Sequence, residues 1–494
     1  MYRRLTKRQR ALRQVLTYTL MTIAVIVIVT VSVLFIMGYR LNSTSGGLVQ
    51  GVLVQFGSKP SGATITIDGK TLTGSLGDAH TPNKASLTAG THTFTYQKAG
   101  YATWSKTLSL GAGTLSWLDY ARLVPTKLPV TSVADYPALA SATVSPNEHF
   151  ILLQPDAATP NFSLVDINGD KIKTTDVALP SATYTAADAG TTNQFTVSTW
   201  DGGSRFVLVH HTYGDKSEWL VLDTHHPDQS KNISGTLGVT GVTSMNFAST
   251  SGGVFYGIDN GGTLRKYDVN AGTISRALVN HVTSYHLYQN NIISYTSTDD
   301  ATPVHQVAGV YRDGDDAPIV ITSVDTTQPA PEIAITNFYN NYYVAIAEGS
   351  SLQILSGGFP SSQSDVKSLQ QFAKLTLPFA SAATMTFSPS GQYLLAQNGT
   401  QYLSYDLEYQ RSATATVAST TATPHALTWL DNAYLWTDDD GELSIREFDG
   451  TNVHTINPVA PGFITTLTPN SKYLYSIGKK DTGYQLQRVQ MILS

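Results

Sequence analysis

Apolar residues in this chain recur as short runs separated by turn residues, and helical periodicity is missing after residue 38. The clearest unit is an apolar run, a Ser/Thr-Pro pair, and an aromatic residue that opens the next apolar run. It occurs three times without gaps, at 144–151 (VSPNEHFI), 387–394 (FSPSGQYL) and 467–474 (LTPNSKYL). Because proline presets the backbone of a tight turn, each copy predicts a hairpin between two strands.

Weaker copies of the same unit fill the intervals. One residue from the second predicted strand of each copy gives eight positions: Ile151, Val207, Phe255, Ile293, Val344, Leu394, Leu435 and Leu474. Their intervals average about 46 residues, close to the ~40–50 residues of a four-stranded propeller blade. We therefore predict that residues 128–494 form a β-propeller with eight blades, or with seven; an array of β-sandwiches is the competing fold.

Closure of the predicted ring needs one strand from elsewhere in the chain. The last copy supplies about three strands, and the segment 128–136 (LPVTSVADY) before the first copy could supply the fourth. The segment 387–397 (FSPSGQYLLAQ) also resembles the WD-like repeats of periplasmic propellers. That resemblance implies an extracytoplasmic propeller.

The N-terminal part follows a different pattern. Residues 15–37 contain no charge, and these 23 residues would span roughly 34 Å as a helix, enough for a ~30 Å hydrocarbon core. A cleavable signal peptide has a shorter apolar region and an A-x-A-like site, which the following residues lack. We predict an uncleaved transmembrane helix, a signal-anchor, over residues 15–38.

Residues 1–14 form a short basic tail. Arg3, Arg4, Lys7, Arg8, Arg10 and Arg13 carry six positive charges with no acidic residue among them. Basic residues beside a span stay in the cytoplasm, so we predict a single-pass protein of the cell membrane whose bulk is extracytoplasmic.

A small β-domain is predicted between the span and the propeller. After a linker at 39–51, residues 52–125 alternate apolar and polar positions between Gly-containing turns, which predicts an antiparallel β-sandwich. The segments PSGATITIDG (60–69), LTAGTHTF (87–94) and KAGYATW (98–104) resemble the PEGA domain of bacterial and archaeal envelope proteins. The resemblance implies an attachment or interaction module without catalytic residues, in a bacterial membrane-anchored protein.

Composition narrows the functional classes. Charged residues make up 14% of the chain, the net charge is −5, and cysteine is absent. Without cysteine there is no disulfide, thiol nucleophile or Cys-ligated metal. A nucleic-acid partner would need a clustered basic face, so we expect none.

Candidate metal ligands occur in two segments. Asp223, His225 and His226 lie in DTHHPD, and Asp438 and Asp440 lie in DDDGE. Imidazole and carboxylate groups suit Zn²⁺ or Ca²⁺, but both segments sit where hairpin turns belong. We interpret them as turn residues and expect neither a metal nor a cofactor.

Candidate binding residues are aromatic. Tyr339 and Tyr342 lie among asparagines, and Trp200 and Trp219 lie in the second predicted blade. Such side chains can stack on sugar rings or anchor protein partners.

These features favour a non-catalytic surface protein. The propeller face would bind a protein or an envelope glycan, with the PEGA-like module as a stalk or attachment domain. The alternative is a propeller hydrolase or lyase that acts on envelope glycan or peptide in the central channel. That function would require acidic, basic and histidine side chains from several blades to converge.

Overall fold

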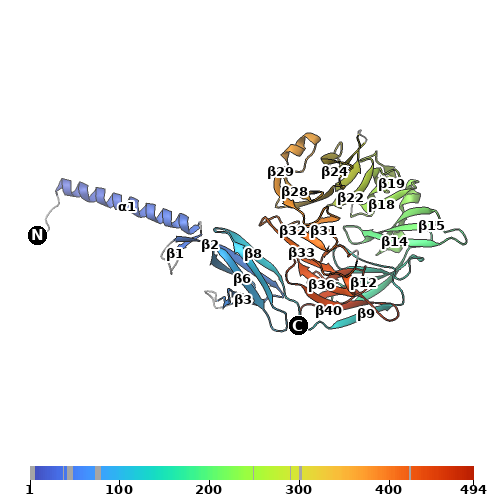
Figure 1. Cartoon of the computed structure of the whole chain (residues 1–494), viewed down its shortest axis with the longest axis horizontal. Coiled ribbons are helices and arrows are strands. Elements are labelled where there is room, and N and C mark those ends of the chain that lie inside the picture. Colours follow the sequence, from blue (N-terminus) through green and yellow to red (C-terminus); the bar gives the residue numbers. More distant parts are fainter. Residues whose placement is uncertain are drawn as a thin grey trace. The chain divides into compact units, whose positions relative to one another are not determined.

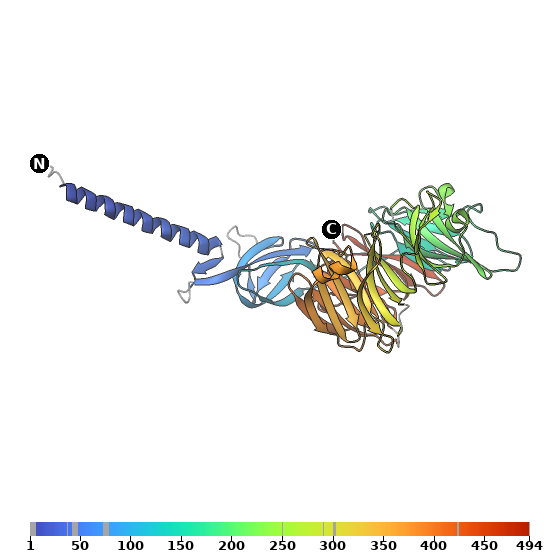
Figure 2. The same cartoon turned by 90° about the horizontal axis from the view of Figure 1, so that it is seen from above.

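The structure is a computed structural model that describes residues 6–36, 38–41, 48–72, 79–248, 250–289, 291–299, 303–421 and 424–493. The chain divides into two compact units, Met1–Lys127 and Leu128–Ser494 (Figures 1 and 2). Arg3 and Arg4 of the predicted basic tail lie outside the described residues.

The first unit begins with a long apolar helix, α1 (Lys7–Ile36) (Figure 1). Within it, Arg10–Phe35 has a mean hydropathy of 2.5 and is long and apolar enough to cross a membrane, as an anchor or a signal sequence. Three threonine hydroxyls donate to the carbonyl four residues earlier: Thr17 (2.8 Å), Thr19 (2.8 Å) and Thr22 (2.9 Å). These bonds pair the threonine hydroxyl groups within the apolar helix itself.

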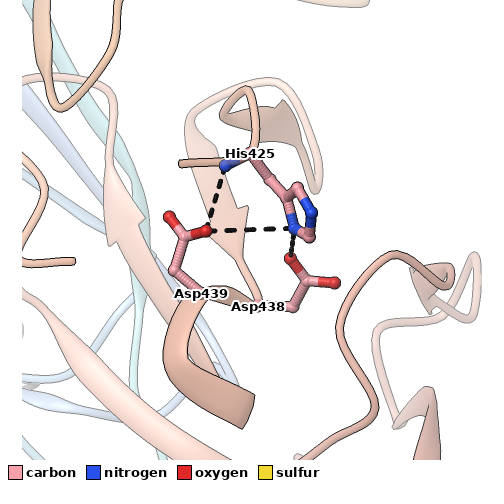
Figure 3. A group of neighbouring side chains, drawn as sticks. All are labelled: His425, Asp438 and Asp439. Carbon is pink, nitrogen blue, oxygen red and sulfur yellow. Dashed lines mark hydrogen bonds and ion pairs between the residues drawn. The ribbon is translucent and has the colours of Figure 1, made fainter. Parts of the chain in front are cut away.

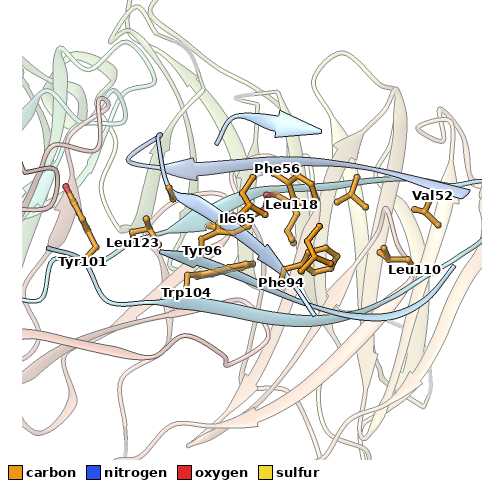
Figure 4. Packing of buried hydrophobic residues seen from close by; sticks show 14 residues of the cluster. Val52, Phe56, Ile65, Phe94, Tyr96, Tyr101, Trp104, Leu110, Leu118 and Leu123 are labelled. Atoms are coloured by element: carbon orange, nitrogen blue, oxygen red, sulfur yellow. Dashed lines mark hydrogen bonds between the residues drawn. The ribbon is translucent and has the colours of Figure 1, made fainter. Parts of the chain in front are cut away.

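Two four-stranded sheets follow the helix. One contains β1 (Tyr39–Leu41), β2 (Leu48–Lys59), β5 (Asn83–Thr88) and β8 (Leu115–Arg122). The other contains β4 (Lys70–Thr71), β3 (Thr64–Ile67), β6 (Gly90–Gln97) and β7 (Trp104–Leu110). Alternate residues of these strands meet in one apolar core, which explains the period of two in the sequence (Figure 4). Inside it, the Tyr96 hydroxyl donates to the Leu118 carbonyl at 2.9 Å.

Two details of this region differ from the sequence-based expectation. Residues 39–41 and 48–51, predicted as linker, belong to β1 and β2, because the two strands pair and so satisfy their backbone groups. β8 pairs with β2 in parallel, whereas the sandwich was predicted to be antiparallel. The chain enters β8 from β7, which belongs to the other sheet. Because no hairpin joins β8 to β2, the antiparallel direction is not imposed on this pair.

The second unit contains eight four-stranded antiparallel sheets among its described residues, which confirms the β-propeller prediction. The first blade contains β10 (Ser141–Val144), β11 (Phe150–Gln154), β12 (Asn161–Asp166) and β13 (Lys173–Ala178), and the second contains β14 (Asn193–Trp200), β15 (Phe206–Tyr213), β16 (Lys216–Asp223) and β17 (Lys231–Asn232). The third blade contains β18 (Val242–Phe247), β19 (Val254–Asp259), β20 (Leu264–Asp268) and β21 (Thr273–Ile274), and the fourth contains β22 (Val282–Tyr288), β23 (Ile292–Thr298), β24 (His305–Arg312) and β25 (Ile319–Asp325).

The next four blades complete the ring (Figure 1). The fifth blade contains β26 (Glu332–Phe338), β27 (Asn341–Glu348), β28 (Ser351–Gly357) and β29 (Gln370–Thr376), and the sixth contains β30 (Thr384–Phe387), β31 (Tyr393–Asn398), β32 (Gln401–Asp406) and β33 (Arg411–Thr416). The seventh blade contains β34 (Thr428–Trp429), β35 (Tyr434–Thr437), β36 (Glu442–Glu447) and β37 (His454–Pro458), and the eighth contains β38 (Thr465–Leu467), β39 (Tyr473–Lys479), β40 (Tyr484–Gln490) and β9 (Val130–Tyr136). Short helices α2 (Ile233–Leu237), η1 (Pro227–Gln229), η2 (Gln363–Ser368) and η3 (Asp439–Gly441) lie in connections.

The ring closes with a strand from its beginning. β9 pairs antiparallel with β40, from Val130 beside Val489 to Tyr136 beside Tyr484, so the segment 128–136 supplies the predicted fourth strand. Lys472 of the last blade pairs with Asp170 of the first at 2.7 Å. Closure joins the two ends of the repeat and removes a free sheet edge.

The repeated Ser/Thr-Pro unit forms the hairpin between the first and second strands of a blade. Its hydroxyl oxygen accepts the N–H of the aromatic residue five positions on, at 2.9 Å for Ser145, 3.1 Å for Ser388 and 3.1 Å for Thr468. In the weaker copy of the second blade Asp201 takes this role and accepts the N–H of Phe206 at 2.7 Å. The copies therefore conserve an acceptor oxygen that fixes the turn.

Candidate functional site

The propeller has two faces with different connections. Every blade is the same meander, and the first strands of several neighbouring blades contact one another, as β10 does with β14 and β26 does with β30. One face, which we call the inter-blade face, therefore carries the connections between blades and the hairpins between second and third strands. Val130 lies beside Val489 at the end of a third strand, so the chain enters the propeller on the opposite face.

A hollow of about 480 Å³ lies on the inter-blade side of the third and fourth blades. The beginnings of β18 and β22 line it, together with the hairpin that follows β19. Its polar lining residues are Thr243, Ser244, Asn246, Asp259, Asn260, Thr283, Ser284 and Tyr285.

Both inner strands carry the same irregularity at this hollow. Each begins with Val-Thr-Ser, at 242–244 and at 282–284. In each strand the pairing register shifts between the valine and the serine, so Thr243 and Thr283 are the extra residues of two β-bulges. A bulge turns a side chain out of the regular alternation, and here both threonines are exposed. We call this site the twin-bulge hollow.

Hydrogen bonds orient the polar groups of the twin-bulge hollow. The Thr243 hydroxyl donates to the Ile258 carbonyl at 3.1 Å, and the Thr283 and Thr296 hydroxyls lie 2.7 Å apart. A hydroxyl that donates one bond keeps acceptor capacity for a ligand. These threonines therefore present fixed oxygen atoms to the hollow.

Tyr285 links the hollow to the core. Asn246 donates from Nδ2 to the Tyr285 hydroxyl at 2.9 Å, and that hydroxyl donates to the Tyr256 carbonyl at 2.9 Å. Burial raises the pKa of Tyr285 to about 12, so the hydroxyl stays neutral at physiological pH. Asp259 is engaged in its own turn, where its Oδ1 accepts the N–H groups of Gly261 (3.0 Å) and Thr263 (2.9 Å).

A second polar group lies at the seventh blade. Among the described residues, His425, Asp438 and Asp439 bring three ligand-type atoms within 4.8 Å of one another (Figure 3). His425 lies in the connection before β34, and the two aspartates lie between β35 and β36. We call these three residues the His425 group; its connections place it on the inter-blade face.

The contacts of the His425 group are those of an ion pair. His425 Nδ1 lies 2.6 Å from Asp438 Oδ1, and the other oxygen of Asp438 accepts the N–H of Gly462 at 2.6 Å. Asp439 accepts the backbone N–H of His425 at 3.0 Å and the Thr437 hydroxyl at 3.1 Å. The hydrogen bond to Asp438, helped by the charges of both aspartates, raises the pKa of His425.

A metal would need a different arrangement of the His425 group. Two ligands about 2.1 Å from one tetrahedral ion lie roughly 3.4 Å apart, which exceeds the 2.6 Å between Nδ1 and Oδ1. The carboxylate oxygens also accept protein N–H or O–H groups. The donor set therefore fits a structural pair. Asp438, in the hairpin between β35 and β36, binds one connection through His425 and another through Gly462.

The candidate ligands from DTHHPD form a capped turn. Arg205 binds Asp223 with Nη2 at 2.6 Å, and Asp223 accepts the backbone N–H groups of His225 and His226, each at 3.0 Å. Burial alone would raise the pKa of Asp223, but Arg205 and these N–H groups lower it. The two imidazoles are exposed, and the structure joins them to Asp223 through their backbone.

The candidate pair from DDDGE is divided. Asp438 belongs to the His425 group, whereas Asp440 turns to a neighbouring segment and accepts the N–H of Thr420 at 3.0 Å. Asp440 has a positive φ of 61°, a left-handed conformation that is found in tight turns. Sequence reasoning missed His425 and Asp439, since His425 comes from a separate connection with no motif around it.

The aromatic candidates divide between surface and core. Tyr339 is 70% exposed in the hairpin after β26, and Tyr342 is half-buried against Phe359 with ring centroids 5.3 Å apart. Trp200 and Trp219 are only 6% and 4% exposed. These two tryptophans are core residues, which corrects their selection as binding residues; Trp200 packs between the first and second blades, and Trp219 packs between the second and third.

Residues 52–126 match the PEGA domain family. We refer to this part of the chain as the PEGA domain, after the family that it matches. The match confirms the resemblance seen in the sequence, and the PEGA domain corresponds to the two packed sheets described above.

Solved structures with similarity to the chain include several propellers. The C-terminal WD40 domain of Sif2 has a TM-score of 0.48 and 11% identity, over 74% of this chain and 99% of that chain. The Dos1 propeller has a TM-score of 0.46 and 10% identity, over 74% and 94%. An oligogalacturonate lyase in complex with manganese has a TM-score of 0.41 and 10% identity, over 72% and 98%. A comparison with curated proteins gives no match.

Proposed function

We propose that this protein is a membrane-anchored, non-catalytic binding protein whose propeller takes up an uncharged, hydroxyl-rich ligand, such as an envelope glycan, in the twin-bulge hollow. One observation carries the proposal: two neighbouring inner strands repeat the same Val-Thr-Ser bulge and expose both threonines to one hollow. Bulges are enriched next to functional sites, where they redirect side chains, so two bulges that border one hollow favour a role in recognition.

The chemistry of the hollow suits sugar hydroxyl groups. Serine and threonine hydroxyls and asparagine amides can each donate and accept, as sugar hydroxyls also do. Its volume of about 480 Å³ lies within the roughly 300–1,000 Å³ of small-molecule sites. A strongly charged ligand would require unpaired cationic or anionic groups, whereas Asp259 is bound within its own turn.

The remaining parts of the chain suit presentation of this site outside the membrane. In this proposal α1 is an uncleaved anchor with a cytoplasmic N-terminus, and the PEGA domain is the stalk or attachment domain. The chain enters the propeller opposite the inter-blade face, so the tether does not begin beside the hollow.

Glycan-array binding by the full chain in detergent micelles tests the proposal. We expect retention of neutral oligosaccharides, and about tenfold weaker binding when Thr243→Val and Thr283→Val are combined, since each lost hydrogen bond is worth about 0.7 kcal/mol. Thr384→Val is the matched control, because Thr384 is an exposed inner-strand threonine of the sixth blade. Failure of every neutral glycan, together with capture of an envelope protein, would favour a protein partner.

A hydrolase or lyase acting on envelope glycan or peptide is the second candidate. The observation that favours it is the His425–Asp438 pair, in which a buried carboxylate holds one nitrogen of a ring that is 48% exposed. Such a pair could serve as a general base. Turnover of glycan or peptide by the purified chain, lost in His425→Ala, would favour the enzyme over the binding protein.

A further inference from the structure

The outward face of the PEGA domain carries an apolar patch at one end. Leu53, Leu115 and Trp117 are 39%, 41% and 38% exposed. Leu53 pairs with Leu115, and Gln55 pairs with Trp117, so the three apolar side chains are neighbours on one face. The alternate residues of the same strands point into the core, which leaves this patch as a second apolar surface of the sheet.

Backbone hydrogen bonds place this patch close to the end of α1. The N–H of Gly51 donates to the carbonyl of Gly38 at 2.9 Å, and the N–H of Gly113 donates to the carbonyl of Gly51 at 3.0 Å. Gly38 in turn donates to Phe35, the last residue of the apolar span. Gly51 and Gly113 therefore lie where the helix leaves the hydrocarbon core, if α1 is an anchor.

The headgroup region adds roughly 5–8 Å on each side of the hydrocarbon core. Leu53 and Leu115 each lie two residues past one of these glycines, about 7 Å of extended chain, which is within this layer. Trp117 lies about 13 Å along, so it lies at the same depth when β8 is strongly inclined to the membrane normal. Tryptophan is enriched at this depth, because its ring is apolar and its N–H is polar.

The polarity of the same face changes with distance from α1. Farther along β8, the next outward residue after Trp117 is the exposed Asp119. On β5, the exposed Lys84 is paired with Gln55 and can reach anionic headgroups. A surface for a protein partner has no reason to become polar with distance from the helix, whereas a surface beside lipid has.

We propose that this end of the PEGA domain rests on the membrane, with Leu53, Leu115 and Trp117 inserted among the lipid headgroups. The inference rests on the proposed role of α1 as an anchor. The contact would hold the PEGA domain against the bilayer and limit its swing about the short connection after α1.

Quenching of tryptophan fluorescence by brominated lipid tests this contact. The full chain is reconstituted in vesicles of phosphatidylcholine and phosphatidylglycerol, with and without bromine on the upper acyl chain. We expect quenching in the native chain that is largely lost in Trp117→Phe and retained in the control Trp429→Phe, whose tryptophan lies in the propeller. Leu53→Ser combined with Leu115→Ser should also reduce it.

The outcomes separate this inference from the proposed anchor. If alkaline washing releases the chain from the vesicles, α1 is not an anchor and both proposals fail. If the chain stays inserted and Trp117→Phe is quenched as strongly as the native chain, the membrane contact alone is refuted. Cross-linking of two copies through position 117 would also refute it, because the patch would then be a dimer interface.

Discussion

The twin-bulge hollow and the His425 group both lie on the inter-blade face, but they treat their polar atoms in opposite ways. In the His425 group, buried carboxylates accept hydrogen bonds from a histidine and from backbone N–H groups. In the twin-bulge hollow, exposed threonine hydroxyls make one oriented contact each and keep acceptor capacity. The carboxylates of the charged cluster are paired within the protein, whereas the threonine hydroxyls keep acceptor capacity for the proposed ligand.

This difference shows that a collection of ligand-type residues is a poor guide to a binding site by itself. Buried charges must be paired, so most of them belong to the framework. Neutral hydroxyls at two repeated bulges have no such structural requirement. The comparison predicts that substitutions in the His425 group change stability, and that substitutions in the twin-bulge hollow change ligand binding.

The largest expected effect is on stability, for Asp438→Ala. The change leaves the Gly462 N–H and the His425 ring without their acceptor, and we expect the free energy of unfolding to fall by about 2 kcal/mol. Urea denaturation followed by tryptophan fluorescence measures it. Glycan binding by the folded variant should be unchanged. A strong loss of binding would contradict the assignment of the His425 group to stability alone.

Thr243→Val combined with Thr283→Val should produce the converse result. We expect about tenfold weaker glycan binding, about 1.4 kcal/mol, because the variant retains volume but loses two oxygen atoms. The unfolding free energy should change by less than about 1 kcal/mol. Equal loss in Thr384→Val would show that the effect is not specific to the bulges.

Tyr285→Phe should have an intermediate effect on both stability and binding. The hydroxyl joins Asn246 of the hollow to the Tyr256 carbonyl, so its removal should cost about 1 kcal/mol of stability and weaken binding a few-fold. Calorimetric titration with the best array glycan and thermal denaturation provide the two readouts. A variant with native affinity would show that Asn246 does not contact the ligand.

The smallest expected effect is a pH dependence. The pKa of His425 is raised in the folded protein, so its pairing contributes fully below the unfolded value of about 6.5 and is lost as pH rises through the folded value. Because the ring is half exposed, we expect a loss of only about 0.5 kcal/mol. Urea denaturation at a series of pH values above and below about 6.5 measures this change in the free energy of unfolding. His425→Gln is the control, because it should lack this pH dependence. Glycan binding should not follow this pH dependence.

Much of the fold could be predicted from local patterns. The Ser/Thr-Pro hairpins depend on residues within five positions of one another, so the sequence reveals them directly. The pairing of β9 with β40 was also predictable, because the last repeat lacked a strand and the segment 128–136 was left over. The parallel pairing of β8 was not, since no local turn determines it.

The candidate site was harder to predict, for a related reason. The repeated Val-Thr-Ser is visible in the sequence, but nothing in three residues indicates that each threonine is a bulge or that the two strands share a hollow. Trp200 and Trp219 show the reverse case, in which residues suited to binding are buried by the packing of the blade.

The sequence alone therefore determined the parts that depend on short-range or additive interactions: the apolar helix, the alternating strands, the hairpin acceptors and the repetition of the sheets. Only the tertiary structure decided which polar groups meet and whether they are satisfied, as in the pairing of His425 with Asp438. That outcome depends on atoms brought together from separate connections, and hydrogen bonds form only within about 3 Å.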